Sequence, residues 1–298
     1  MRVFVTGATG FIGSAVVKEL ITAGHQVLGL ARSPDKATTL VSVGAAVHSG
    51  SLENLEDLTR AAAQCDGVIH LAFNHDFSKF VANCEDDRQV IKALGSALAG
   101  SDRPLIVTSG TAIANTAPGT PAKEEDAALS CQVNPRAASE EAAAALAADG
   151  VNVSVVRLPQ VHDTARQGLV SYAIAMFRAQ GACAYVGDGE NCWSAAHVLD
   201  VARLYRLAIE RAEPSARYHA VAEEGVVFRD IVEAVGRRLR LPVTSIAPEA
   251  AEAHFGWLAS FMTHSLPASS AQTRKILAWA PTRPGLIADL ERLQLSEG

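Results

Sequence analysis

This sequence of 298 residues has few tyrosines, no excess of basic residues, no closely spaced pair of cysteines and no long apolar run. The chain has four tyrosines, six lysines and only 5% aromatic residues. Its 32 acidic residues exceed its 26 lysines and arginines, which gives a net charge of −6. A protein that binds a phosphate backbone or an anionic lipid surface needs a positive surface, so no nucleic acid and no membrane is expected as a main partner. A small molecule is the expected partner.

Five cysteines are scattered along the chain, without a Cys-x-x-Cys pair or a close Cys/His cluster. This usage predicts reduced thiols and no metal site. No apolar run approaches the roughly 18 residues of a membrane-spanning helix, and the amino terminus lacks the pattern of a secretory signal. We therefore expect a soluble, unprocessed, cytoplasmic protein.

Short apolar strands alternate with helices through the first half of the chain. The expected strands are residues 3–6, 26–31, 46–48, 67–72, 104–109 and 151–158. Such alternation predicts an α/β fold, with a doubly wound parallel sheet covered on both faces. Beyond Pro159 the alternation gives way to helices, isolated strands and an expected hairpin around residues 187–189. We infer a nucleotide-binding part, residues 1–160, and a smaller, mainly substrate-binding part, residues 161–298, some of which returns to the main sheet.

Glycines recur at positions 7, 10 and 13, in a turn between the first strand and the first helix. Gly7 permits a tight turn, Gly10 lets the backbone approach a pyrophosphate, and Gly13 allows the helix to pack closely on the strand. The helix N-terminus offers free N–H groups to the anion. The motif predicts a dinucleotide site, with expected contacts from Gly7, Thr9, Gly10, Phe11 and Ile12.

The second strand ends in Arg32 and Ser33, and Lys36 follows one helical turn later. A protein that binds NAD usually has an acid near this position for the ribose hydroxyl. A guanidinium can instead bond bidentately to the additional phosphate of NADP. NADP(H) is therefore the predicted cofactor. In the alternative interpretation, Arg32 and Lys36 are ordinary surface charges and Asp35 serves the ribose.

Six further segments resemble motifs of the extended short-chain dehydrogenase/reductase superfamily. They are Gly50-Ser51-Leu52, His70-Leu71-Ala72-Phe73, Val107-Thr108-Ser109-Gly110, Arg157-Leu158-Pro159-Gln160-Val161, His197-Val198-Leu199-Asp200-Val201-Ala202 and Leu277-Ala278-Trp279-Ala280-Pro281-Thr282. The resemblance covers nearly the whole chain and implies a Rossmann fold. By resemblance, Ser51 and Leu52 pack on the adenine, Leu71, Ala72 and Phe73 line the cofactor, Pro159 contacts the nicotinamide, and Ser109 is the catalytic hydroxyl. Ser51 replaces the acid usual at its position.

The superfamily's Tyr-x-x-x-Lys pair is missing. In the family the tyrosine protonates the developing alkoxide and the lysine lowers the pKa of that tyrosine. The four residues found four places after the tyrosines are Met176 (after Tyr172), Gly189 (after Tyr185), Ile209 (after Tyr205) and Ala222 (after Tyr218). Alignment of the helix before the sixth strand puts Arg136 and Glu140 in the two places. Arginine stays charged and cannot act as an ordinary proton donor.

This pattern resembles an atypical branch of the superfamily, the angucyclinone-type ketoreductases of antibiotic biosynthesis, which act on polycyclic aromatic polyketides. The resemblance implies an NADPH-dependent ketoreductase in which a hydroxyl of the substrate, next to the ketone, stabilises the developing charge. Ser109 at most donates a hydrogen bond there. A catalytically silent NADP-binding sensor is the alternative, and a sugar-nucleotide epimerase or dehydratase is a third interpretation.

The expected substrate contacts are aromatic and lie in the second half of the chain. They are Tyr185, Trp193, Phe255 and Trp257. The last two belong to an apolar stripe at helical spacing over residues 249–262. Such a stripe suits a lid over a flat hydrophobic substrate, and core packing explains it equally well.

Overall fold

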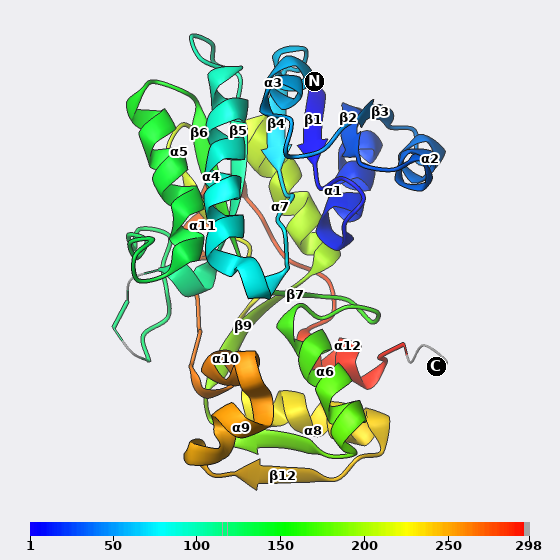
Figure 1. Cartoon of the computed structure of the whole chain (residues 1–298), viewed down its shortest axis with the longest axis vertical. Coiled ribbons are helices and arrows are strands. Elements are labelled where there is room, and N and C mark those ends of the chain that lie inside the picture. The colour runs from blue at the N-terminus through cyan, green and yellow to red at the C-terminus, as the bar shows by residue number, and fades with distance from the viewer. Residues whose placement is uncertain (115, 118, 295–298) are drawn as a thin grey trace.

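A seven-stranded parallel sheet forms the centre of the computed structural model, which describes residues 1–114, 116–117 and 119–294 (Figure 1). The strand order is β10-β6-β5-β4-β1-β2-β3, and every pair is parallel. The strands are β1 (Arg2–Thr6), β2 (Gln26–Ala31), β3 (Ala46–Ser49), β4 (Gly67–His70), β5 (Leu105–Gly110), β6 (Val153–Leu158) and β10 (Arg217–His219). The predicted α/β fold with a doubly wound parallel sheet of the Rossmann type is confirmed.

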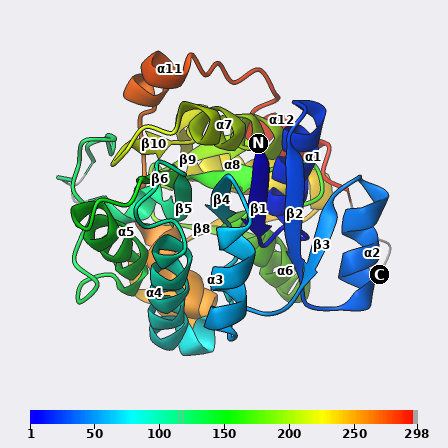
Figure 2. The same ribbon diagram turned by 90° about the horizontal axis from the view of Figure 1, so that it is seen from above.

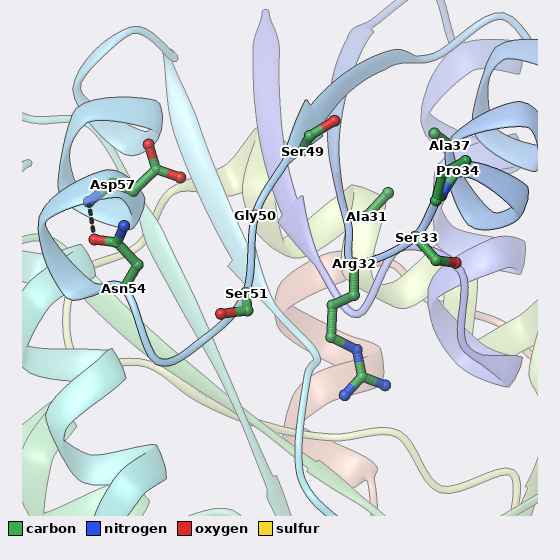
Figure 3. Close-up of a pocket in the computed structure, with 10 residues that line it drawn as sticks. All are labelled: Ala31, Arg32, Ser33, Pro34, Ala37, Ser49, Gly50, Ser51, Asn54 and Asp57. Carbon is green, nitrogen blue, oxygen red and sulfur yellow. Dashed lines mark hydrogen bonds between the residues drawn. The ribbon is translucent and has the colours of Figure 1, made fainter.

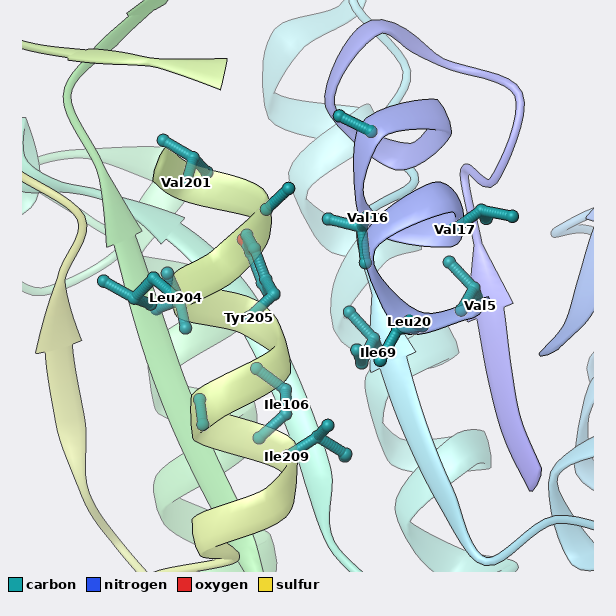
Figure 4. Close-up of a cluster of buried hydrophobic side chains, with 14 of the residues drawn as sticks. Val5, Val16, Val17, Leu20, Ile69, Ile106, Val201, Leu204, Tyr205 and Ile209 are labelled. Carbon is teal, nitrogen blue, oxygen red and sulfur yellow. The ribbon is translucent and has the colours of Figure 1, made fainter. Parts of the chain in front are cut away.

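Helices cover both faces of this sheet (Figure 2). One face packs on α1 (Phe11–Thr22), α2 (Pro34–Ser42) and α7 (Val198–Arg211), and the other on α3 (Leu55–Ala63), α4 (Phe80–Ser96) and α5 (Ala138–Ala148). Val3 is buried on the first face, as is Val5 (Figure 4), and Phe4 is buried on the second. Successive strand residues point to opposite faces, so a strand covered on both sides is apolar throughout.

A smaller group of elements faces the carboxyl ends of the main strands (Figure 1). β7 (Gln160–His162), β9 (Cys192–His197) and β11 (Glu223–Val227) form one sheet, and β8 (Cys183–Val186) pairs in parallel with β12 (Val243–Ile246). The helices here are α6 (Leu169–Gln180), α8 (Phe228–Leu239), α9 (Ala251–Phe255), α10 (Ala259–Thr263) and α12 (Leu286–Glu291). They share one apolar cluster. By contrast, β10 joins the main sheet, and α11 (Ala271–Leu277) contacts β10 and α7.

The hairpin expected around residues 187–189 is wrong. β8 and β9 lie in different sheets, because β8 pairs with β12 whereas β9 pairs with β7 and β11. Gly187 and Gly189 do adopt positive φ angles of 61° and 68°. The turn signal was therefore correct, but the turn leads the chain from one sheet to another, and the pairing partners lie far away in the sequence.

Short 3₁₀ helices connect several of these elements. They are η1 (Phe77–Lys79), η2 (Thr111–Ile113), η3 (Pro135–Ala137), η4 (Pro248–Ala250) and η5 (Gly256–Leu258). Within the described ranges, no helix combines the length and apolar character needed to cross a membrane. The same ranges contain no cluster of side chains suited to a metal ion. All five cysteines are free.

Candidate cofactor and substrate site

The glycine-rich turn lies at the carboxyl end of β1. Gly7 has a φ of +66°, and a Cβ added there would come within 2.8 Å of the Ala72 nitrogen. A Cβ on Gly13 would lie 2.0 Å from the Gly7 oxygen. Both places therefore require glycine. Helix α1 begins after Gly10 without a side-chain cap, which leaves its first N–H groups available to an anion.

β1 and β4 mark the point where the strand order changes direction. The chain proceeds from β1 to β2 and β3 on one side, and from β4 to β5 and β6 on the other. Ligands of doubly wound sheets bind in the crevice outside the carboxyl ends of such strands. Six half-buried residues with predicted cofactor contacts lie around this crevice: Thr9, Phe11, Ile12, Leu71, Ala72 and Phe73.

A cavity of about 850 Å³ opens at the carboxyl ends of β2 and β3 (Figure 3). Its volume falls in the range of small-molecule sites. The ten residues that line it are Ala31, Arg32, Ser33, Pro34, Ala37, Ser49, Gly50, Ser51, Asn54 and Asp57. The predicted contacts Arg32, Ser33 and Ser51 are thus brought together. Exposed Lys36 lies on α2 outside this lining, and Leu52 packs against the α3–α5 core.

The two charged side chains that line this cavity, Arg32 and Asp57, differ in their surroundings. Asp57 is the carboxylate among its lining residues, and it is already bonded at 2.6 Å to His48 Nε2 and at 3.0 Å to Arg60 Nη2. The hydrogen bonds from Arg60 and His48 lower the pKa of Asp57. Arg32 is exposed and extends from the end of β2 (Figure 3). The cavity can therefore bind an anion at Arg32.

Arg136, which the motif alignment predicts to take the place of the family's tyrosine, is turned into the protein. Its Nη1 donates to Asp87 Oδ2 at 3.0 Å and to the Ser139 hydroxyl, and its Nη2 donates to the Thr108 carbonyl at 2.9 Å. Its Cζ lies 4.3 Å from the centre of the Phe73 ring. The guanidinium is thus bonded along one edge and stacked on one face.

Asp87 is the anion that compensates Arg136. It also accepts hydrogen bonds from Ser139 Oγ at 2.5 Å and from His70 Nε2 at 2.9 Å. Burial raises the energy of the carboxylate, but the charge of Arg136 and these two hydrogen bonds outweigh that effect. Together they hold the pKa of Asp87 at about 2. Asp87 is therefore ionised at neutral pH.

His70 connects this ion pair to the cofactor turn. Its Nδ1 lies 2.7 Å from Thr6 Oγ1, and these two residues are register partners at the ends of β4 and β1. Thr6 Oγ1 accepts the N–H groups of Leu71 and Ala72. Its own proton is then directed to Nδ1, so His70 donates from Nε2 to Asp87. A continuous chain of hydrogen bonds thus runs beneath the crevice from Thr6 to Arg136.

Glu140, in the place of the family's lysine, is also compensated. Its two carboxylate oxygens accept Nε and Nη2 of Arg157 at 2.7 and 2.8 Å. Arg157 is completely buried, and Glu140 is 7% exposed. Arg157 further donates to the Asp126 carbonyl at 3.0 Å. Arg136 and Glu140, the two residues predicted at the positions of the missing pair, therefore each have an oppositely charged partner.

Besides Thr108, two residues near the end of β5 carry hydroxyls, and both are buried, with Thr111 6% exposed. Ser109 is 4% exposed, and its Oγ has no hydrogen-bond partner among the described atoms. By strand alternation it points to the α4–α5 face, as Val107 does. Thr111 instead lines a cavity of about 60 Å³ together with Pro159, Trp193 and others. The sequence interpretation missed Thr111, although its hydroxyl follows the predicted motif directly.

The four predicted substrate residues are not brought together, and two of them, Trp193 and Phe255, are completely buried. Trp193 lines the small cavity, and Trp257 is 46% exposed. Phe255 is completely buried in the core of the smaller part, where core packing accounts for it. Tyr185 lies on β8, which pairs with β12 at the end remote from the main sheet (Figure 1).

Three aromatic side chains, Phe77, Tyr172 and Trp257, join the two parts of the chain; we call them the aromatic bridge. Phe77 and Trp257 stack with ring centres 4.5 Å apart, and Tyr172 meets Trp257 edge-on at 5.3 Å. Phe77 comes from η1, which follows β4, and the other two come from α6 and η5. The ring centre of Trp257 also lies 6.4 Å from that of Phe261, and Phe261 lines the small cavity.

The parallel sheet, the glycine-rich turn and the cavity beside it define a dinucleotide-binding protein. A family model described as the NAD-dependent epimerase/dehydratase family matches residues 3–221. The chain belongs to this family, whose extended short-chain members include oxidoreductases, epimerases and dehydratases.

Similar curated proteins extend over almost the whole chain. An uncharacterised protein of Schizosaccharomyces pombe is 44% identical over 293 residues, which cover 97% of this chain and 98% of that protein. An uncharacterised protein of Saccharomyces cerevisiae is 43% identical with the same coverage. A decarboxylating sterol-4-alpha-carboxylate 3-dehydrogenase of Dictyostelium discoideum is 26% identical over 248 residues, or 76% of this chain and 73% of that one.

Solved structures share the fold at low identity. The dTDP-glucose 4,6-dehydratase DesIV of Streptomyces venezuelae, with NAD bound, has a TM-score of 0.78 at 18% identity and covers 98% of this chain and 96% of its own. The human epimerase family protein SDR39U1, with NADPH, has a TM-score of 0.74 at 19% identity, covering 98% and 99%. Members of this fold thus hold either cofactor.

Proposed function

We propose that this protein is an NADPH-dependent ketoreductase. The observation that carries the proposal is the exposed Arg32 at a cavity whose lining carboxylate is bonded elsewhere. The residues fit the cofactor: Gly7 and Gly10 would hold the pyrophosphate, and Arg32 and Ser33 the 2′-phosphate, with Lys36 adding positive charge. When bound, NADPH supplies a hydride.

The substrate class in this proposal is a ketone on a polycyclic aromatic molecule. The aromatic bridge supports it, because offset-stacked and edge-on rings recognise flat aromatic groups. In this account, residues 1–160 form the cofactor side of the cleft and residues 161–298 mainly the substrate side. Trp257, which is 46% exposed, contacts the substrate, and the completely buried Trp193 acts from the lining of the small cavity, whereas Phe255 supports the fold around them.

The proton comes from the substrate in this account, because the family's proton donor is absent. A hydroxyl next to the ketone stabilises the developing alkoxide, and one such donor contributes about 3 kcal/mol. Thr111 at the small cavity can add a hydrogen bond. Ser109 contributes at most a hydrogen bond within the protein.

Two matched ketones test this proposal. A hydroxylated polycyclic aryl ketone should oxidise NADPH, seen as a fall in NADPH absorbance. The methoxy analogue should react about 100-fold more slowly, because it loses about 3 kcal/mol of transition-state stabilisation. Equal rates for both would refute assistance by the substrate. NADPH binding without turnover of any such ketone would instead favour a silent NADP-binding sensor.

A further inference from the structure

Arg136 has more hydrogen-bond donors than its neighbours use. A guanidinium offers five N–H donors in one plane. Nη1 donates to Asp87 and Ser139, and Nη2 donates once, to the Thr108 carbonyl. Within the described part of the chain, the Nε–H and the second Nη2–H have no acceptor. The side chain is 17% exposed, so a ligand in the crevice can reach it.

The orientation of Arg136 is fixed before any ligand arrives. Phe73 covers one face of the guanidinium at 4.3 Å. Asp87, which binds its Nη1, is itself held by His70 and Ser139. Donors that are already oriented need no reorganisation when negative charge develops beside them, which is why they are effective in catalysis.

Arg136 lies at the edge of the sheet where ligands of this fold bind. Its partner Thr108 is close to the carboxyl end of β5, and Phe73 follows the end of β4. Its positive charge acts beyond Asp87: burial, and then the charge of Arg136, lowers the pKa of His75 in the loop after β4. The free donors therefore belong to a partly desolvated corner of the crevice.

We propose that the free Nε–H and Nη2–H of Arg136 form an oxyanion site, which takes the ketone oxygen of the substrate as it becomes negative. This inference rests on the proposed function. As the hydride joins the carbonyl carbon, the π-electron pair of the C=O bond moves to the oxygen. The neighbouring substrate hydroxyl delivers the proton to that oxygen, and solvent then reprotonates the resulting phenolate. Arg136 keeps all its protons throughout.

An aryl carboxylate tests this site without any turnover. We expect 2-naphthoate to bind the full chain saturated with NADP⁺, whereas the neutral 2-naphthamide binds weakly, as measured by calorimetry. Arg136→Lys keeps the charge but not the planar fork, and should weaken naphthoate binding at least about tenfold. Arg136→Met should abolish naphthoate binding, with NADP⁺ affinity unchanged in both variants.

Arg103 provides a matched control. It also donates to backbone carbonyls, those of Ala63, Cys65 and Ala97, but it precedes β5 at the opposite edge of the sheet. Arg103→Lys should leave naphthoate binding unchanged. If Arg136→Met does not fold, Arg136→Lys alone decides the question. Unaltered naphthoate affinity in a folded Arg136 variant, or no binding to the native chain, would overturn the proposal.

Turnover separates this proposal from the proposed function. Arg136→Lys should lower kcat about 10- to 100-fold with the KM for NADPH unchanged, and added guanidinium should restore part of the rate in Arg136→Ala. Loss of stability alone would not respond to guanidinium. If the chain binds naphthoate through Arg136 but reduces no ketone, the anion site at Arg136 stands and the proposed reductase function is refuted. If ketone turnover is unchanged by substitution of Arg136, the reductase function stands and the oxyanion site is refuted.

Discussion

Arg136 and Asp87 form an ion pair, with 3.0 Å between Nη1 and Oδ2, in the place where the family's proton-donating tyrosine is expected. The lysine's place shows a second compensated charge, because Glu140 binds Arg157 through both oxygens. Neither position has merely lost the family's side chain. Each substituted side chain is built into a hydrogen-bonded arrangement of its own, so the departure from the family's dyad is a structured feature of this chain.

The buried Glu140–Arg157 pair gives the first prediction. Arg157→Met leaves Glu140 without its counter-ion in a buried place, which should lower the free energy of unfolding by about 3–5 kcal/mol. The double variant Glu140→Leu/Arg157→Met should recover most of this loss. Urea denaturation measures both. Arg206→Met, which removes more exposed ion pairs with Glu19 and Glu210, serves as a control and should cost about 1 kcal/mol or less.

Asp87 should make stability depend on acid pH. Its pKa of about 2 lies below the unfolded value near 3.9. Its contribution is therefore complete above about pH 4 and is lost as the pH falls through about 2. This contribution is on the order of 2 kcal/mol. Urea denaturation across this window should show a shallower loss in Asp87→Asn than in the native chain, and equal slopes would contradict the assignment.

The fold was predictable because its signals are local. Strand β1 has apolar residues on both faces, and Gly7 and Gly13 stand where a Cβ cannot fit, so strand, turn and helix follow from adjacent residues. The hairpin after β8 failed because its turn residues do not specify a pairing partner. β8 pairs with β12, about 60 residues further on.

The candidate site was only partly predictable. Arg32 and Ser33 follow a strand in the sequence, so their place at the cavity was foreseeable. The ion pair between Arg136 and Asp87 spans 49 residues, and no local pattern indicates it. Phe255 and Trp257 share one apolar stripe, but only the structure shows that the first lies in the core and the second at the surface.

Cofactor choice should depend on Arg32. Arg32→Ala should weaken NADPH binding about 10- to 100-fold, because a charge-assisted bidentate contact to the 2′-phosphate is lost. NADH binding should change little. Titration of cofactor fluorescence measures both. Arg211→Ala is the control, since Arg211 is an exposed arginine that pairs with Glu213 and does not line the cavity. An equal loss for NADPH and NADH would contradict recognition of the phosphate.

Trp257 should affect the substrate and not the cofactor. Trp257→Ala removes the ring that stacks on Phe77, which should raise the KM for an aromatic ketone about tenfold and leave NADPH affinity unchanged. Val133→Ala, at a side chain that is 70% exposed, is the neutral control. A small aliphatic ketone should show no difference between Trp257→Ala and the native chain. An unchanged KM for the aromatic ketone would remove the aromatic bridge from the substrate site.

Isotope tracing shows directly whether this chain, without a tyrosine donor, transfers a hydride to a ketone. The protein is incubated with a hydroxylated polycyclic aryl ketone and NADPH that carries deuterium on one or the other face of nicotinamide carbon 4. One of the two labelled cofactors should place deuterium on the carbinol carbon of the product, as read by mass spectrometry. Bound cofactor with no deuterium in any product from either label would contradict hydride transfer.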